Sequence, residues 1–177
     1  MQLRHVDADP TEHRAELLAV AVAREPDASR GHLARLDEAL GGAVARALAG
    51  PEMSGRDGDE VLLYGSARGP RRVLLLGIGK AEQVTRETVR RFAGRAVRAA
   101  ERLRLESLAL CLDGLEGLDD AARAQAAAEG AALAACKVTV ETIGPMTVEP
   151  SGDVTLKPGQ TATIRIRGGQ APYFVNL

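Results

Sequence analysis

The chain has 177 residues, 23 of them Lys or Arg and 24 Asp or Glu, and its net charge of −1 gives no overall attraction to nucleic acid or membranes. Aromatic residues make up 2% of the chain and Trp is absent, so the core must be built from Ala, Leu and Val. Two cysteines, Cys111 and Cys136, are too few for a disulfide framework and fit a reducing, cytoplasmic compartment.

We expect neither a secretory signal nor a membrane span near the amino terminus. Arg4, Asp7 and Asp9 interrupt the first ten residues, unlike the apolar core of a signal peptide. The apolar run Leu17 to Ala23 is far shorter than the ~20 residues that cross a bilayer. Because charged residues bound this run, it predicts a strand, and residues 2–6 predict an earlier one.

From Gly31 the apolar residues recur every three or four positions, which predicts one face of a helix. These residues are Leu33, Leu36, Leu40, Val44 and Leu48. The Gly41-Gly42 pair interrupts the pattern. It marks either a break between two short helices or a close packing contact.

Residues 60–77 predict two antiparallel strands, 60–66 and 72–77, because the connection between them is too short for anything but a hairpin. Val73 to Leu76 is continuously apolar, as in a central parallel strand covered on both faces. Gly77 and Gly79 then permit a tight exit turn. Ligands of open α/β sheets collect beyond the carboxyl ends of such strands, so this is where a site would lie if the chain has one.

The next segments alternate between helix and strand. Thr85 is a predicted N-cap for a helix that runs to about Leu105. Residues 107–112 form an apolar strand, and residues 119–135 an Ala-rich helix. This alternation predicts a three-layer α/β domain over residues 1–136.

Residues 137–177 change in character, with many Val, Ile and Thr residues and no helical period, which predicts a β-rich segment. Residues 154–164 and 168–175 resemble the opening strands of bacterial immunoglobulin-like repeats. About forty residues are too few to close a sandwich, so an incomplete immunoglobulin-like segment is expected. A truncated or chimeric reading frame would explain why residues 1–136 and residues 137–177 differ in character.

The amino-terminal domain of the leucyl (cytosol) aminopeptidase family is similar to the segment Val73-Leu74-Leu75-Leu76-Gly77-Ile78-Gly79-Lys80. Members of this family are di-zinc metallopeptidases active in proteolysis. Residues 36–42, 84–90 and 129–133 resemble further parts of that domain, in the same order. The resemblance covers roughly residues 1–136. It implies a macro-domain-like, three-layer α/β sandwich with a mixed sheet.

The resemblance also implies where the peptidase chemistry lies. In the family, the metal ligands and the catalytic Lys and Arg belong to a separate carboxyl-terminal domain, which would begin after Cys136. The family's Asn-Thr-Asp-Ala-Glu-Gly-Arg motif is absent from this sequence. We therefore expect no catalytic residue, metal ligand or cofactor in this chain, since the zinc or manganese sites would lie in the missing domain. The chain alone is expected to be inactive, and to pack on a peptidase domain or support a homo-oligomer.

Gly77, Gly79 and Lys80 are the candidate ligand-binding residues, because backbone N–H groups and a lysine can cradle a phosphate. The segment is not a Walker A loop, since Leu74 replaces the required Gly and Ala81 follows the lysine. A purely structural turn and a nucleotide site both remain open. A hydrolase acting on ADP-ribose conjugates is a third hypothesis, which rests on fold analogy alone.

One edge of the helix after Thr85 carries a basic stripe, which consists of Arg91, Arg95, Arg98 and Arg102. It is either a solvated face that pairs with nearby acids, such as Glu101, or a surface that contacts nucleic acid or an acidic partner. A binding module that uses this stripe, or the β tail as a template for a partner chain, is the alternative function.

The remaining polar residues predict no metal centre and no nucleophilic triad. His5, His13 and His32 are scattered, without the spacing of metal ligands. Asp57 and Asp59, next to Glu60, are expected to form a polar turn before a strand and not a cation site.

Overall fold

The computed structural model describes residues 9–13, 15–65, 70–135, 139–142, 148–149 and 163–166. The chain divides into two compact units, residues 2–135 and the tail from residue 136, and each is described by itself. The strand predicted over residues 2–6 lies outside the described residues. No helix of the described residues is long and apolar enough to cross a membrane.

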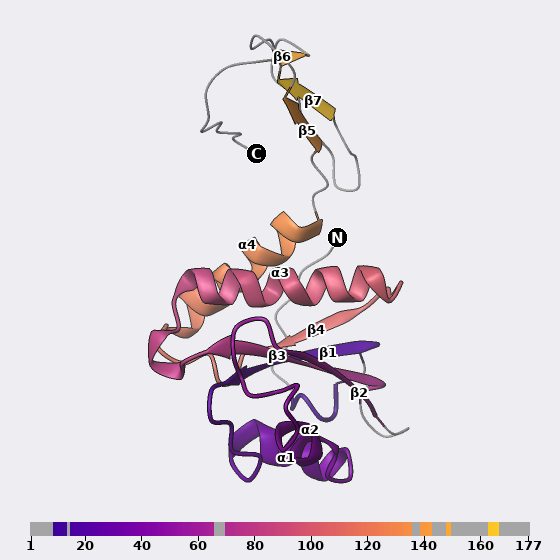
Figure 1. The fold of residues 1–177 in the computed structure, drawn as a ribbon, viewed down its shortest axis with the longest axis vertical. Coiled ribbons are helices and arrows are strands. Elements are labelled where there is room, and N and C mark those ends of the chain that lie inside the picture. Colours follow the sequence, from indigo (N-terminus) through magenta and orange to yellow (C-terminus); the bar gives the residue numbers. More distant parts are fainter. Residues whose placement is uncertain are drawn as a thin grey trace. The chain divides into compact units, whose positions relative to one another are not determined.

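The first unit is built on a mixed four-stranded sheet with the order β2-β3-β1-β4 (Figure 1). The strands are β1 (Leu17–Ala23), β2 (Glu60–Tyr64), β3 (Arg72–Gly79) and β4 (Leu108–Cys111). β1 pairs in parallel with both β3 and β4, whereas β2 is antiparallel to β3. The predicted antiparallel pair and the central parallel strand are both confirmed.

Helices cover both faces of this sheet, which gives the three layers seen in Figure 1. α1 (Gly31–Ala39) and α2 (Ala43–Leu48) lie on one face, and α3 (Arg86–Arg102) and α4 (Asp120–Ala135) lie on the other. Because both faces are covered, β1 and β3 are apolar at every central position, with no polar alternation. The predicted α/β class and the three layers are confirmed.

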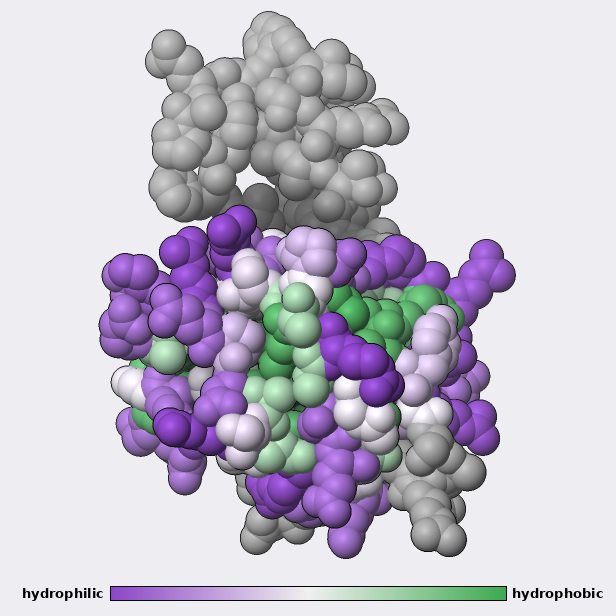
Figure 2. Space-filling model, turned by 60° about the horizontal axis from the view of Figure 1, so that its bottom comes forward, coloured by the Kyte–Doolittle hydropathy of each residue, from purple (hydrophilic) through white to green (hydrophobic). Residues whose placement is uncertain are grey.

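Successive residues of β1 and β3 point into two separate cores. Leu17 and Leu74 pack under α3 and α4 around Phe92, whereas Leu18 and Leu75 pack against α1 and α2. The α1–α2 layer is the smaller one. In Figure 2, which turns this side toward the reader, hydrophobic surface is visible between polar side chains.

The Gly41-Gly42 pair separates α1 from α2, as one of the two readings of the sequence predicted. Both glycines have a positive φ, +60° and +78°, which ends α1 and starts α2 in a new direction. The carboxylate of Asp37 accepts a hydrogen bond from the backbone N–H of Ala45 at 2.8 Å and so ties the two helices together.

Thr85 caps α3, as predicted. Its hydroxyl accepts a hydrogen bond from the backbone N–H of Thr88 at 3.3 Å, and the Thr88 hydroxyl accepts one from the Thr85 N–H at 3.2 Å.

α3 and α4 approach closely at Gly130, where a Cβ would lie 2.2 Å from the carbonyl oxygen of Arg90. Glu129 next to it forms an ion pair with the Arg90 guanidinium at 2.6 Å.

The described residues of the tail form a three-stranded sheet with the order β5-β7-β6. Its strands are β5 (Thr139–Thr142), β6 (Val148–Glu149) and β7 (Thr163–Ile166). β7 is parallel to β5 and antiparallel to β6. Most of the residues that resemble immunoglobulin-like repeats, and Cys136, lie outside the described part of the chain.

Candidate functional site at the end of β3

β3 does not end in a turn at Gly77, so the predicted exit turn is wrong. The strand continues through Gly77 and Ile78 to Gly79, with a bulge in its pairing with β1: Val22 faces Gly77, whereas Ala23 faces Gly79. Lys80 follows with extended backbone and an exposed side chain, before a single 3₁₀ turn, η1 (Ala81–Gln83). Another segment packs directly on Gly77, whereas Gly79 has a φ of +85° and no atom within 4 Å of the place where a Cβ would lie.

That segment is the loop of residues 51–59, which covers the carboxyl end of β3. A Cβ on Gly77 would lie 2.0 Å from the carbonyl oxygen of Arg56, and a Cβ on Gly55 would lie 2.0 Å from the carbonyl oxygen of Ala23. Neither position tolerates a side chain without movement of the backbone. Met53 of the same loop is fully buried in the core on the α1–α2 side.

The two glycine amides of the predicted phosphate cradle already donate to this loop. Gly77 N–H donates to the Asp59 carbonyl at 3.0 Å, and Gly79 N–H donates to the Gly55 carbonyl at 2.9 Å. A phosphate could use these donors only after the loop had moved away. The assignment of Gly77, Gly79 and Lys80 to ligand binding stays a prediction.

Asp59 holds the loop in shape, as the predicted polar turn requires. Its carboxylate accepts hydrogen bonds from the Ser54 N–H at 2.8 Å, the Ser54 hydroxyl at 2.9 Å and the Arg56 N–H at 3.0 Å. Desolvation raises the pKa of Asp59, but these hydrogen bonds outweigh it and keep the pKa below its ordinary value.

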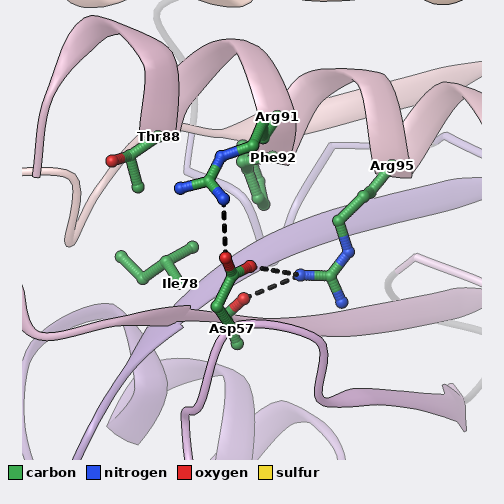
Figure 3. A pocket seen from close by; sticks show the side chains of 7 residues that line it. Asp57, Ile78, Thr88, Arg91, Phe92 and Arg95 are labelled. Carbon is green, nitrogen blue, oxygen red and sulfur yellow. Dashed lines mark hydrogen bonds and ion pairs between the residues drawn. The ribbon is translucent and has the colours of Figure 1, made fainter.

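Two arginines of the basic stripe reach from α3 to this loop (Figure 3). The Arg91 guanidinium lies 2.7 Å from one Asp57 carboxylate oxygen, and Arg95 lies 3.7 Å from the other. Arg95 is the more buried and also donates to two backbone carbonyls, Gly77 at 2.8 Å and Asp59 at 2.7 Å. It therefore joins α3, β3 and the loop in one network.

The other two stripe residues differ from each other. Arg102 forms an ion pair with Glu60 on β2, and not with the Glu101 turn that the sequence suggested. Arg98 is exposed. Three of the four arginines thus face acidic groups of the loop and of β2. A contact of Arg91, Arg95, Arg98 and Arg102 with nucleic acid stays a prediction.

A shallow hollow lies between these arginines and β3. It is a surface depression that encloses no space for a water molecule, and not an enclosed cavity. The lining consists of Asp57, Gly77, Ile78, Thr88, Arg91, Phe92 and Arg95.

Two other reactive side chains lie outside the hollow: Cys111 is buried in the core, and His32 is partly buried on α1. Burial raises the pKa of the free Cys111 thiol to about 11, so it is a poor nucleophile. Burial lowers the pKa of His32, whose Nε2 has no hydrogen-bond partner among the described residues. Within the part of the chain that the structure describes, no three His, Cys, Asp or Glu side chains gather as a metal centre requires.

Sequence reasoning missed how the loop joins α3. It identified the Arg stripe and the acidic turn separately, but their contacts span 34 residues between Asp57 and Arg91 and 18 between Gly77 and Arg95. The available signal was Met53, an apolar residue in a polar loop, together with the opposite charges of turn and helix.

The sequence and the fold agree with one family. The profile of the cytosol aminopeptidase family, N-terminal domain, matches residues 19–139. The described residues of the first unit carry the mixed sheet, the Gly-Gly break and the glycine-ended β3 on which the resemblance was based. The chain belongs to the cytosol aminopeptidase family, and its matched part is the amino-terminal domain.

Several bacterial relatives support this assignment. A probable cytosol aminopeptidase of Cyanothece sp. (strain PCC 7425) is 32% identical over 135 residues, which cover 76% of this chain and 27% of that protein. One of Acidobacterium capsulatum is 38% identical over 100 residues, 55% of this chain and 20% of that protein. The matched part of the chain thus spans between a fifth and about a quarter of the length of these relatives.

Solved structures show the same fold. A mutant of tomato leucine aminopeptidase superposes with a TM-score of 0.59 at 22% identity, over 91% of this chain and 31% of that chain. The bottromycin maturation enzyme BotP in complex with Mn has a TM-score of 0.50 at 29% identity, over 70% of this chain and 23% of that chain.

Proposed function

We propose that the first unit is a non-catalytic domain that packs against a peptidase domain in the cytoplasm and supports its oligomer. The observation that carries this proposal is the family match over residues 19–139, in a chain that spans about a quarter of its relatives. The described residues bring together no set of donors that would hold the zinc or manganese ions of the family, so we assign no step of peptide hydrolysis to them.

The surface that would meet the peptidase domain includes the outer side of α4. Leu133 is a large apolar side chain near the end of this Ala-rich helix, and 58% of its surface is exposed. Burial of Leu133 against a second domain would remove this exposed apolar surface from water.

Two assays test the proposal. The purified chain, incubated with leucine p-nitroanilide and either Zn²⁺ or Mn²⁺, should give no turnover, whereas a complete cytosol aminopeptidase gives turnover under the same conditions. Turnover by this chain would contradict the proposal. The chain should also co-purify with the peptidase domain of the Cyanothece relative. Leu133→Asp should reduce the amount of peptidase domain that is recovered. Ala128→Asp, on the same helix, is the control for the added charge.

A further inference from the structure

β2 forms one edge of the four-stranded sheet, and on its outer side it pairs with no strand among the described residues. Sheet edges in monomeric proteins are usually protected by Pro, Lys, a bulge or a covering segment. The sequence Glu-Val-Leu-Leu-Tyr of β2 contains neither Pro nor Lys, and its pairing with β3 has no bulge. Among the described residues no strand uses this edge, so its outward backbone groups can pair with another strand.

The register with β3 identifies which backbone groups face outward. Gly65 N–H donates to the Arg71 carbonyl at 2.9 Å, and Gly77 N–H donates to the Asp59 carbonyl at 3.0 Å, so both pairs are hydrogen-bonded pairs. Such pairs alternate along an antiparallel ladder. Val61 and Leu63 therefore turn their N–H and C=O groups toward β3. Glu60, Leu62 and Tyr64 turn theirs to the free edge.

We propose that this edge pairs with β2 of a second copy of the chain, antiparallel about a two-fold axis at Leu62, so that the sheet continues from one copy into the other. In this register Leu62 meets its own counterpart, Glu60 faces Tyr64 of the second copy, and Val61 faces Leu63. Each of the three outward residues exchanges both backbone hydrogen bonds with its opposite residue.

The side chains favour this occupant over other arrangements. Tyr64 has 71% of its surface exposed, and its phenol can donate to the Glu60 carboxylate of the second copy. Val61, Leu62 and Leu63 are only partly buried in one copy, so the pairing covers apolar surface on both faces of the strand. An in-register parallel pairing would instead set Glu60 against Glu60. The contact does not depend on a peptidase domain.

Two measurements on the full chain test the proposal directly. Sedimentation equilibrium should show a monomer–dimer equilibrium. Amide hydrogen exchange should show that Leu62 and Tyr64 gain protection as protein concentration rises, whereas Val61 and Leu63 are protected at every concentration. A monomer at all concentrations, or protection of Leu62 and Tyr64 that does not change with concentration, would overturn the proposal.

A matched pair of variants identifies the surface. Tyr64→Glu places a like charge opposite Glu60 twice in each dimer, whereas Tyr64→Lys places an opposite charge there. The dimer dissociation constant of Tyr64→Glu should exceed that of Tyr64→Lys by about tenfold. Leu62→Pro, which removes an outward N–H and leaves the β3 ladder intact, should give a folded monomer. Equal dissociation constants for the two Tyr64 variants would overturn the proposal. A dimer that formed through the tail, and not through β2, would give this result.

Discussion

Gly77 lies so close beneath Arg56 that a Cβ would stand 2.0 Å from the Arg56 carbonyl oxygen. This contact is a structural reason for glycine at position 77 of β3. The loop of residues 51–59 occupies the place where an open α/β sheet would bind a nucleotide, and Arg95 holds the loop and β3 together from α3.

The first prediction compares two glycines of the same strand. Gly77→Ala should reduce the free energy of unfolding by about 2–4 kcal/mol, because the backbone of the loop must move. Gly79→Ala meets no atom within 4 Å and suffers only the strain of its φ of +85°, so about 1–2 kcal/mol is expected. Urea unfolding followed by circular dichroism measures both. Equal losses would mean that the loop does not pack on Gly77.

Much of the fold was predictable because the local signals agreed. The continuous apolar run of β3, the Thr85 cap and the Gly-Gly break each depend on neighbouring residues, and the structure confirms all three. The end of β3 was misread for a physical reason. A glycine that permits a turn and a glycine that permits close packing leave the same mark in a sequence, and only the contact with Arg56 distinguishes them.

The candidate site was less predictable for a related reason. The ion pairs of Arg91 with Asp57 and of Arg102 with Glu60 join segments 34 and 42 residues apart, whereas helical periodicity reports only neighbours three or four positions away. The stripe was identified correctly as a row of charges. Its partners depended on how the sheet places β2 and the loop beside α3.

The second prediction concerns the two aspartates of the loop. Asp59→Ala removes the acceptor of three hydrogen bonds and should cost about 1–3 kcal/mol of stability. Asp57→Ala removes half-exposed ion pairs and should cost at most about 1 kcal/mol. Because the folded state lowers the pKa of Asp59, its contribution is full above the unfolded pKa of about 4 and is lost as the pH falls through the folded pKa. Thermal unfolding at pH 7 and pH 3 tests both the order and the sign.

The third prediction concerns the buried thiol. With the pKa of Cys111 raised to about 11, about one thiol in a thousand is ionised at pH 8, and burial also blocks reagents. In a Cys136→Ser background, Ellman's reagent should not modify the native protein within minutes but should react at once in 6 M guanidinium. Fast reaction of the native protein would show that the sheet opens near the end of β4.

The fourth prediction tests the alternative function, a nucleic-acid contact through the basic stripe. Asp57 and Glu60 now neutralise three of the four arginines, so Asp57→Asn with Glu60→Gln should strengthen binding to a DNA duplex and steepen its salt dependence. Fluorescence anisotropy at 20 and 200 mM salt measures both. Arg98→Ala in the same background serves as the control for the exposed member of the stripe. No binding by any of these proteins at low salt would eliminate the alternative.

The last prediction concerns His32 on α1. Burial lowers the pKa of His32. The charge of Asp113, a hydrogen bond with the backbone of Ala21 and the charge of Glu116 oppose this shift only in part, and the Nε2 of His32 has no hydrogen-bond partner among the described residues. The unfolded chain therefore binds a proton more readily than the folded protein does, so stability is full above the unfolded pKa of about 6.5 and falls as the pH drops below it. The free energy of unfolding cannot change by more than about 1.4 kcal/mol per pH unit for one titrating group.

Urea midpoints between pH 7.5 and 5.5 should fall in the wild type and stay nearly level in His32→Gln, whereas His13→Gln should behave as the wild type does. A wild-type midpoint that is constant over this range would show that the imidazole gains a partner, such as water, on protonation.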